Sequence, residues 1–400
     1  MVLALDVLEP VRGAAGLARV DRRAVESAIA HDGAKAVAIQ LRTPITDRVS
    51  PRAYDVDLMM FAALPAFLPE RRHAADPQGR SLDITWYPQS LLEQPEKLAQ
   101  LGLAAHRFMA SEAVHDPQGL SAACRAAMQA CFHRADIRAA RWNVFLDVGW
   151  KTVREIGITW DFPELARFWL HMASSSCIAL GIDGLGGFCP NVFTRPLPYL
   201  EEIEAQTGLA LRAEVIETLG LDQAPEDTFA PLRRIHRVVS QRFAEPRWPD
   251  AMRKLTRAEY AYTIAADELE FRIAVARDML AHGQPESALH YLRFWAYSLA
   301  RIPMIHARAA EGVDAAFLQP ETAVLPDLRQ HCPEIVDDLR RVLAGGAEVD
   351  AAQVRRGIDS VVRLRDTLAG ELRSRGFAMR PLPEWAPFRP QQRQSDRGQP

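Results

Sequence analysis

Three aspartates inside two short apolar segments have the residue type and spacing to bind a metal ion. Asp55 and Asp57 stand two apart in Tyr54–Phe61, and Asp83 lies within Ser81–Tyr87. Alternate residues of a strand share one face of a sheet, so Asp55 and Asp57 point the same way, and Asp83 on a neighbouring strand would complete an oxygen cage for Mg²⁺. Carboxylates inside apolar strands are costly unless their charge is compensated, which a divalent cation would do. A single Asp-x-Asp also arises on the solvent face of a half-buried strand, so the surrounding elements matter.

The elements expected around these acids are short strands framed by helices. The apolar spacing predicts a helix over Val20–His31 and a first strand over Ala36–Leu41, followed by the two acidic strands. Beyond them, Pro88–Leu101 predicts a helix, and Ala113–Leu120 predicts a late strand that runs into an Asp-Pro-Gln-Gly turn. We expect the three carboxylates to converge in a cleft.

This order resembles the DNA polymerase β-like nucleotidyltransferase superfamily, and within it the small-molecule, aminoglycoside-type nucleotidyltransferases. In that family a helix and a strand ending in a Gly-Ser turn precede a strand with Asp-x-Asp, a strand with one Asp and a helical domain. The resemblance implies that Asp55, Asp57 and Asp83 hold one or two Mg²⁺ ions and that Asp83 helps to deprotonate the acceptor hydroxyl. It covers about the first third of the chain well and extends loosely to residue 200.

A second pair of charged residues, Asp147 and Lys151, stands on the helix predicted over Ala135–Ile156. Residues four apart lie on one face of a helix, one turn from each other. In the family that the chain resembles, a carboxylate and a lysine in this arrangement supply the base and a triphosphate contact, which implies those roles for Asp147 and Lys151. The same spacing also describes an ordinary surface ion pair, and Glu155 extends the stripe and could replace Asp147.

The chain departs from the family where the Gly-Ser turn should stand. Arg42–Asp47 takes its place, and Pro44 removes one of the backbone amides that would bind phosphate. The groups left to bind the triphosphate are Arg42, Thr43, Thr46, Arg48 and Lys151. A lapsed or repurposed site is therefore an alternative to a working enzyme.

The composition favours a globular protein without a nucleic-acid partner. The 400 residues include 48 basic and 51 acidic side chains, so the chain lacks the basic field that non-specific nucleic-acid binding needs. Its five cysteines form no Cys-x-x-Cys pair, which suits free thiols in a reducing compartment. The sequence has no basic leader and no apolar stretch of about 18 residues, so we expect a cytoplasmic protein that does not enter the membrane.

We expect an α+β fold, with an N-terminal nucleotidyltransferase-like mixed sheet flanked by helices and all-α helical bundle domains after it. Strand-type alternation is confined to about the first 120 residues, and helical spacing dominates afterwards. Four prolines among mixed charges suggest a linker between the helical parts. The expected parts are a catalytic domain at 1–133, a helical domain at 134–222, a linker at 223–250, a helical bundle at 251–390 and a disordered tail at 391–400.

These features predict the Mg²⁺-dependent transfer of a nucleoside monophosphate from a nucleoside triphosphate, such as ATP, to a hydroxyl of a small-molecule acceptor. One alternative keeps the fold without the chemistry, as a nucleotidyltransferase-like binding or regulatory protein, and the missing Gly-Ser turn favours it. Another makes the C-terminal helical bundle a protein-interaction module. The nucleotide base, the acceptor and the oligomeric state stay open.

Overall fold

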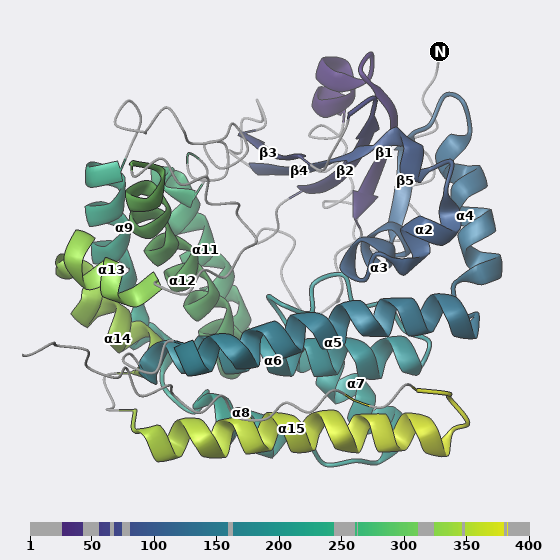
Figure 1. The fold of residues 1–400 in the computed structure, drawn as a ribbon. Helices are drawn as coiled ribbons and strands as arrows, with labels where there is room; N and C mark the ends of the chain where they lie inside the picture. Colours follow the sequence, from purple (N-terminus) through teal and green to yellow (C-terminus); the bar gives the residue numbers. More distant parts are fainter. Residues whose placement is uncertain are drawn as a thin grey trace, which may run out of the picture.

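A small mixed sheet and a large set of helices make up the structure (Figure 1). The computed structural model describes residues 26–42, 56–64, 68–73, 81–158, 163–243, 261, 263–310, 324–345, 349–379 and 382. The described strands all lie before residue 116, and from residue 120 onward the described elements are helices. The expected α+β arrangement followed by helices is confirmed.

In the part of the chain that the structure describes, the sheet contains five strands in the order β3-β4-β2-β1-β5. β2 and β4 run parallel, whereas the pairs β1–β2, β1–β5 and β3–β4 are antiparallel. Four strands fall close to the predicted segments, but β3 was not predicted, because its sequence LPERRH has no alternating apolar pattern. The strands are Ala36–Arg42 (β1), Val56–Ala62 (β2), Leu68–His73 (β3), Ser81–Pro88 (β4) and Ser111–His115 (β5).

Of the described helices, three pack on one face of the sheet: α2 (Pro95–Gln100), α3 (Leu103–Met109) and α4 (Leu120–Cys131). The single helix predicted over 88–101 is instead a 3-10 turn, η3 (Gln89–Leu91), followed by α2. Pro95 is compatible with the first turn of a helix and marks the start of α2. Gly102 has a φ of 54°, which few other residues adopt, and this conformation separates α2 from α3.

Each face of the sheet packs into its own hydrophobic core, since alternate residues of a strand point to opposite faces. One core contains Leu58 and Ile84 together with Ala28 from the helical residues 26–32. The opposite core contains Met59 and Tyr87 together with side chains of α2, α3 and α4. Odd-numbered positions of β2 and β4 therefore face α2–α4.

The helical part that follows is arranged around α6 (Pro163–Gly184), which packs against both α5 (Ala135–Ile158) and α15 (Ala351–Ser374) (Figure 1). Every residue from 173 to 184 is buried, as expected for a helix that is enclosed on all sides. Gly184 lies so close to Leu372 of α15 that a Cβ there would clash with it. Two shorter helices, α7 (Leu197–Thr207) and α8 (Arg212–Leu219), also contact α6.

A second group of helices forms the bundle beside α6. Residues 225–243, for which the prolines led us to expect a linker, are helical: they form η4 (Pro225–Thr228) and α9 (Phe229–Phe243). Pro225 and Pro231 lie in first turns, where proline costs no hydrogen bond. The other members are α11 (Ala266–Ala281), α12 (Pro285–Ala310), α13 (Val324–His331), η5 (Pro333–Ile335) and α14 (Val336–Ala344). Among the helices described, none is both long and apolar enough to cross a membrane.

Candidate functional site

Asp57 and Asp83 are paired residues of two adjacent parallel strands. The β2–β4 ladder aligns Asp57 with Asp83 and Met59 with Thr85. Paired positions on neighbouring strands lie on the same face of a sheet, and here it is the face covered by α2, α3 and α4. Two of the three aspartates predicted as metal ligands are thus neighbours in backbone register.

Two arginine positions extend this row across the sheet. Arg71 of β3 is paired with Asp83, and Arg42 at the end of β1 is paired with Ser111 of β5. The antiparallel ladder between β1 and β2, continued by one residue, brings Arg42 opposite Asp57. We call these positions the sheet row; in strand order they are Arg71, Asp83, Asp57, Arg42 and Ser111.

Several of the predicted site residues lie outside the described residues: Asp55, Thr43, Thr46 and Arg48. The structure describes the backbone alone for Arg42, Asp83 and Lys151. Among the side chains that it does describe, no group of three or more His, Cys, Asp or Glu is spaced to hold a metal ion. Because the side chains of Asp55 and Asp83 are not in that set, the Mg²⁺ site stays a prediction.

The sheet row lies at one end of the sheet, next to α3. At its other end, α3 begins beside α5. Ser111 follows α3 almost directly, and its Oγ donates to the carbonyl of Phe108 in the last turn of that helix (2.7 Å). Just before α3 begins, a Cβ on Gly102 would stand only 2.9 Å from Cγ1 of Val144 on α5. Because the helix between these two points is only about 10 Å long at its usual rise per residue, α5 passes close to the row. Figure 1 shows α3 between the sheet and α5.

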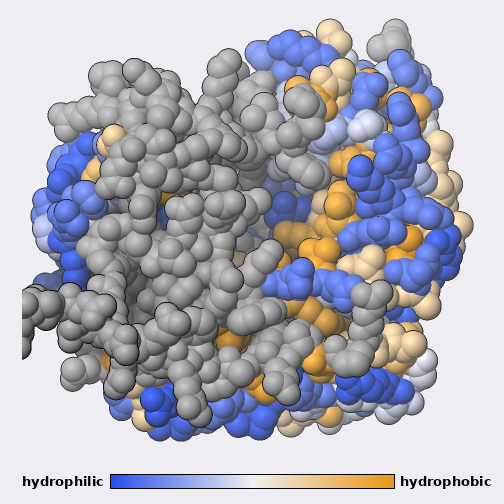
Figure 2. Space-filling model, in the orientation of Figure 1, coloured by the Kyte–Doolittle hydropathy of each residue, from blue (hydrophilic) through white to orange (hydrophobic). Residues whose placement is uncertain are grey.

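Asp147 stands on the same side of α5 as Val144, which contacts Gly102. Positions 144, 147 and 151 follow at spacings of three and four, so they share one side of the helix. The Asp147 side chain is exposed. Val144 is 39% exposed, and it is the large hydrophobic residue that stands out as exposed among the residues that the structure describes. Figure 2 shows hydrophobic residues reaching the surface between the sheet and α5. The predicted base and the position of Lys151 therefore lie on the side of α5 that meets the α2–α3 turn.

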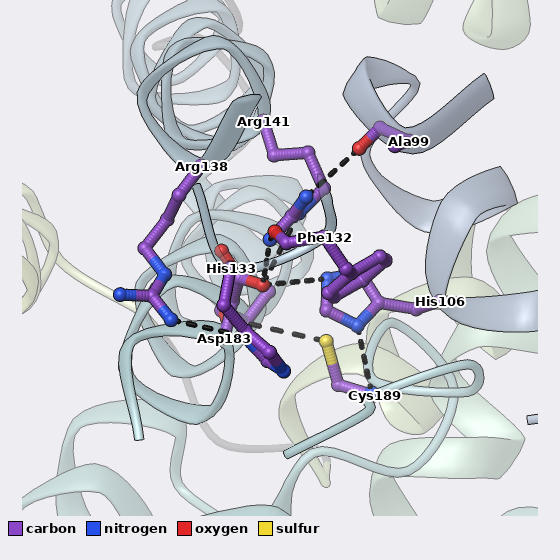
Figure 3. A network of polar contacts seen from close by, with 9 residues as sticks. Ala99, His106, Phe132, His133, Arg138, Arg141, Asp183 and Cys189 are labelled. Atoms are coloured by element: carbon purple, nitrogen blue, oxygen red, sulfur yellow. Dashed lines mark hydrogen bonds and ion pairs between the residues drawn. The ribbon is translucent and has the colours of Figure 1, made fainter. Parts of the chain in front are cut away.

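A buried cluster of polar side chains fixes α5 against the helices of the sheet (Figure 3). Arg141, fully buried on α5, donates to the carbonyl oxygens of Ala99 on α2 and Phe132 after α4, both at 2.9 Å. Its Nε and Nη2 donate to one carboxylate oxygen of Asp183 on α6, at 3.1 and 2.7 Å. The guanidinium also lies 3.7 Å from the centre of the Phe132 ring, within the range of a cation–π contact. One side chain thus ties α5 to three other segments.

His106 of α3 completes this cluster as a neutral imidazole. Its Nδ1 accepts the backbone N–H of Cys189 (3.4 Å), so its proton is on Nε2, which lies 3.5 Å from Asp183 Oδ1. Burial lowers the pKa of His106 from 6.5 to about 4 and outweighs the opposing effect of Asp183. At neutral pH His106 is therefore uncharged and lies close to Asp183 without pairing with it, and the charges that balance are those of Arg141 and Asp183.

Sequence reasoning missed this cluster because its members lie on three helices that are far apart in the chain. Asp183 stands in a glycine-rich stretch, 181–190, whose composition predicts a helix–helix loop, but α6 continues through Asp183 and ends at Gly184. The one signal for the cluster in the sequence is Asp183 itself, an acidic residue among apolar neighbours, because a buried carboxylate needs a partner for its charge. The identity of that partner, Arg141, depends on the packing of α5 against α6.

No protein-family model matches the chain, and no curated protein matches its sequence. The class of protein therefore has to be inferred from the fold, the sheet row and the residues on α5.

Proposed function

We propose that this chain is a Mg²⁺-dependent nucleotidyltransferase that moves a nucleoside monophosphate from a nucleoside triphosphate to a hydroxyl of a small-molecule acceptor. The observation that carries the proposal is the register of Asp57 with Asp83 on adjacent parallel strands. Carboxylates at such positions supply the oxygen ligands that Mg²⁺ prefers, and Asp55, two residues before Asp57, would add a third. A mixed sheet followed by helices agrees with the layout of the family that the sequence resembles.

The roles of the residues follow from their chemistry. Asp147, or Asp83 in its place, takes the proton of the acceptor hydroxyl. The acceptor oxygen then attacks the α-phosphorus, the bond from that phosphorus to the α,β-bridging oxygen breaks, and pyrophosphate leaves. Mg²⁺, when bound, neutralises phosphate charge and lowers the pKa of the hydroxyl. The residues that bind and neutralise the triphosphate are Arg42, Thr43, Thr46, Arg48 and Lys151.

A second candidate, a nucleotide-binding or regulatory protein without catalysis, is favoured by the arginines of the sheet row. Arg71 is paired with Asp83, and Arg42 comes opposite Asp57 in the continued ladder. A guanidinium beside each carboxylate would compensate its charge without a metal ion. The replacement of the Gly-Ser turn by Arg42–Asp47 points the same way.

Thermal unfolding with and without Mg²⁺ distinguishes the two candidates. Mg²⁺ with ATP, GTP, CTP or UTP should raise Tm, because a ligand at about 100 times its Kd stabilises the folded state by about 2.7 kcal/mol. Asp57→Asn and Asp83→Asn should remove the Mg²⁺-dependent part of the shift, since each replaces a charged ligand by a neutral amide. Asp337→Asn is the matched control, because Asp337 on α14 is 87% exposed and should not affect the shift.

The outcomes lead to different conclusions. A Mg²⁺-dependent shift, together with release of pyrophosphate when hydroxyl-bearing acceptors are added, supports the enzyme. A shift of the same size without Mg²⁺ and in both site variants supports the non-catalytic candidate. If labelled nucleotides show no saturable binding at millimolar concentration, both candidates are wrong.

A further inference from the structure

The Arg141–Asp183 pair lies where α5 meets the helices that cover the sheet, and both side chains are fully buried. A buried ion pair is weak evidence for added stability, because removing two charges from water offsets much of their attraction. What such a pair supplies reliably is a defined geometry, since each hydrogen bond requires its partner in one place. The contribution of this pair is therefore the placement of the segments that it joins.

The Arg141–Asp183 pair fixes the position of α5 relative to the sheet. The guanidinium of Arg141 contacts Ala99 and Phe132, which belong to the helical layer over the sheet, and it contacts Asp183 on α6. Figure 3 shows these partners surrounding the guanidinium on different sides. A large rotation or tilt of α5 would strain or break at least one of these bonds. One turn farther along, the close approach of Val144 to Gly102 adds a second point of contact.

Asp147 and position 151 lie farther along the same helix as these two contacts. At about 1.5 Å of rise per residue, Asp147 stands about 9 Å and position 151 about 15 Å beyond Arg141. If α5 tilted by about 10° at Arg141, position 151 would move by about 2.6 Å along the arc that this helix geometry defines. Displacements of about 1 Å are enough to lower the rate of an enzyme about 100-fold.

We propose that Arg141, Asp183, His106 and the Val144–Gly102 contact, together the α5 junction, form a positioning device that sets the distance between the Asp147–Lys151 turn and the sheet row. It rests on the proposed function, because it assigns Lys151 to the triphosphate. The junction residues do not touch the substrate. They act on nucleotide binding only through the placement of Lys151.

A double-mutant cycle tests this directly. The probe is a non-hydrolysable nucleoside triphosphate with Mg²⁺, chosen as the tightest binder of the four common bases, and the readout is its Kd for the whole chain. Arg141→Lys keeps the charge but cannot make the four hydrogen bonds of the guanidinium. It should weaken binding about 10-fold when Lys151 is present. In the Lys151→Ala background it should change Kd by less than about 2-fold, because the contact that it positions is already gone.

A second cycle uses Val144→Ala, because a buried substitution at Arg141 can prevent folding. Val144 is partly exposed, so its truncation leaves the chain folded while it loosens the contact with Gly102. We expect about 3-fold weaker binding with Lys151 and no change without it. Far-UV circular dichroism checks that each variant is folded.

The possible results separate the positioning proposal from the proposed function. Non-additive effects in either cycle support positioning. If the wild type binds the nucleotide and Lys151→Ala weakens binding, but the junction variants have no effect or act equally in both backgrounds, the junction is only structural and positioning is wrong. If the wild type does not bind any of the nucleotides, both the proposed function and the positioning role fall.

Discussion

Among the histidines that the structure describes, three are almost completely enclosed and held without charge, and their burial should make the protein sensitive to acid. His106, His171 and His290 are each exposed by 2% or less. Burial lowers the pKa of His106 to about 4 and, with the help of the Arg293 charge, that of His290 to about 3. The pKa of His171 is also lowered well below 6.5 by burial, with added repulsion from His290 and Arg293.

The sign and the size of the effect follow for His106. Below pH 6.5 the unfolded chain takes up a proton on this residue, whereas the folded chain does so only near pH 4. The stability that His106 contributes is therefore complete above pH 6.5 and is lost as the pH falls toward 4. At about 1.4 kcal/mol per pKa unit, the free energy of unfolding should fall by about 2 kcal/mol between pH 7.5 and pH 5.0 because of His106 alone.

Urea unfolding at these two pH values, followed by circular dichroism, measures this contribution. His106→Gln keeps a polar side chain at this position but does not titrate, so about 2 kcal/mol of the pH dependence should disappear in the variant. His282→Gln, on the half-exposed residue that follows α11, controls for the loss of a histidine as such. If His106→Gln loses stability with falling pH as steeply as the wild type does, His106 is not held neutral and the reasoning is wrong.

Two further substitutions test how the helices are held. Gly102→Ala should destabilise the chain by at least about 1 kcal/mol more than Gly208→Ala in urea unfolding. Both glycines have a positive φ, 54° at Gly102 and 73° at Gly208. A Cβ at Gly208 would meet nothing within 4 Å, whereas a Cβ at Gly102 would clash with Val144. Arg293→Met should cost about 1–3 kcal/mol for each buried acceptor that loses its donor, because the fully buried guanidinium donates to the carbonyl oxygens of Leu219 (2.7 Å) and Gly220 (3.0 Å) at the end of α8. By contrast, the exposed pair of Arg363 with Glu214 should contribute less than about 1 kcal/mol when Arg363→Met is measured in the same way.

The elements that the sequence predicted best are those whose determinants are local. The apolar spacing over 351–374 predicts one helix across this range, and α15 begins at Ala351 and ends at Ser374. Its start is fixed by a neighbour, because the Asp350 side chain accepts the backbone N–H of Gln353 (2.6 Å) and the Gln353 side chain accepts the N–H of Asp350 (2.9 Å). Such contacts span a few residues and are visible in the sequence.

The elements that the sequence predicted poorly depend on distant partners. The prolines of 223–250 predict a linker and outweigh the apolar stripe of α9, yet Leu232, Ile235 and Val239 are fully buried against the bundle. The partner of Asp183 is Arg141, on another helix, and only the packing of α5 on α6 brings them together. Local spacing carries no information about such pairs.

The pairing of Asp57 with Asp83 combines both kinds of information. Once β2 and β4 are adjacent, the apolar pattern fixes their register, because Ile84 must enter the core that holds Leu58, and a slip of one residue would send Asp83 to the opposite face. The parallel direction has a different origin. After β2 the chain first forms β3 at the edge of the sheet, and β4 then occupies the position between β3 and β2. Because β4 pairs antiparallel with β3, it runs parallel to β2. Pro69 suits such an edge position and also hides the strand from pattern-based prediction. The strand that the sequence reading missed is therefore the one that brings the two aspartate positions side by side.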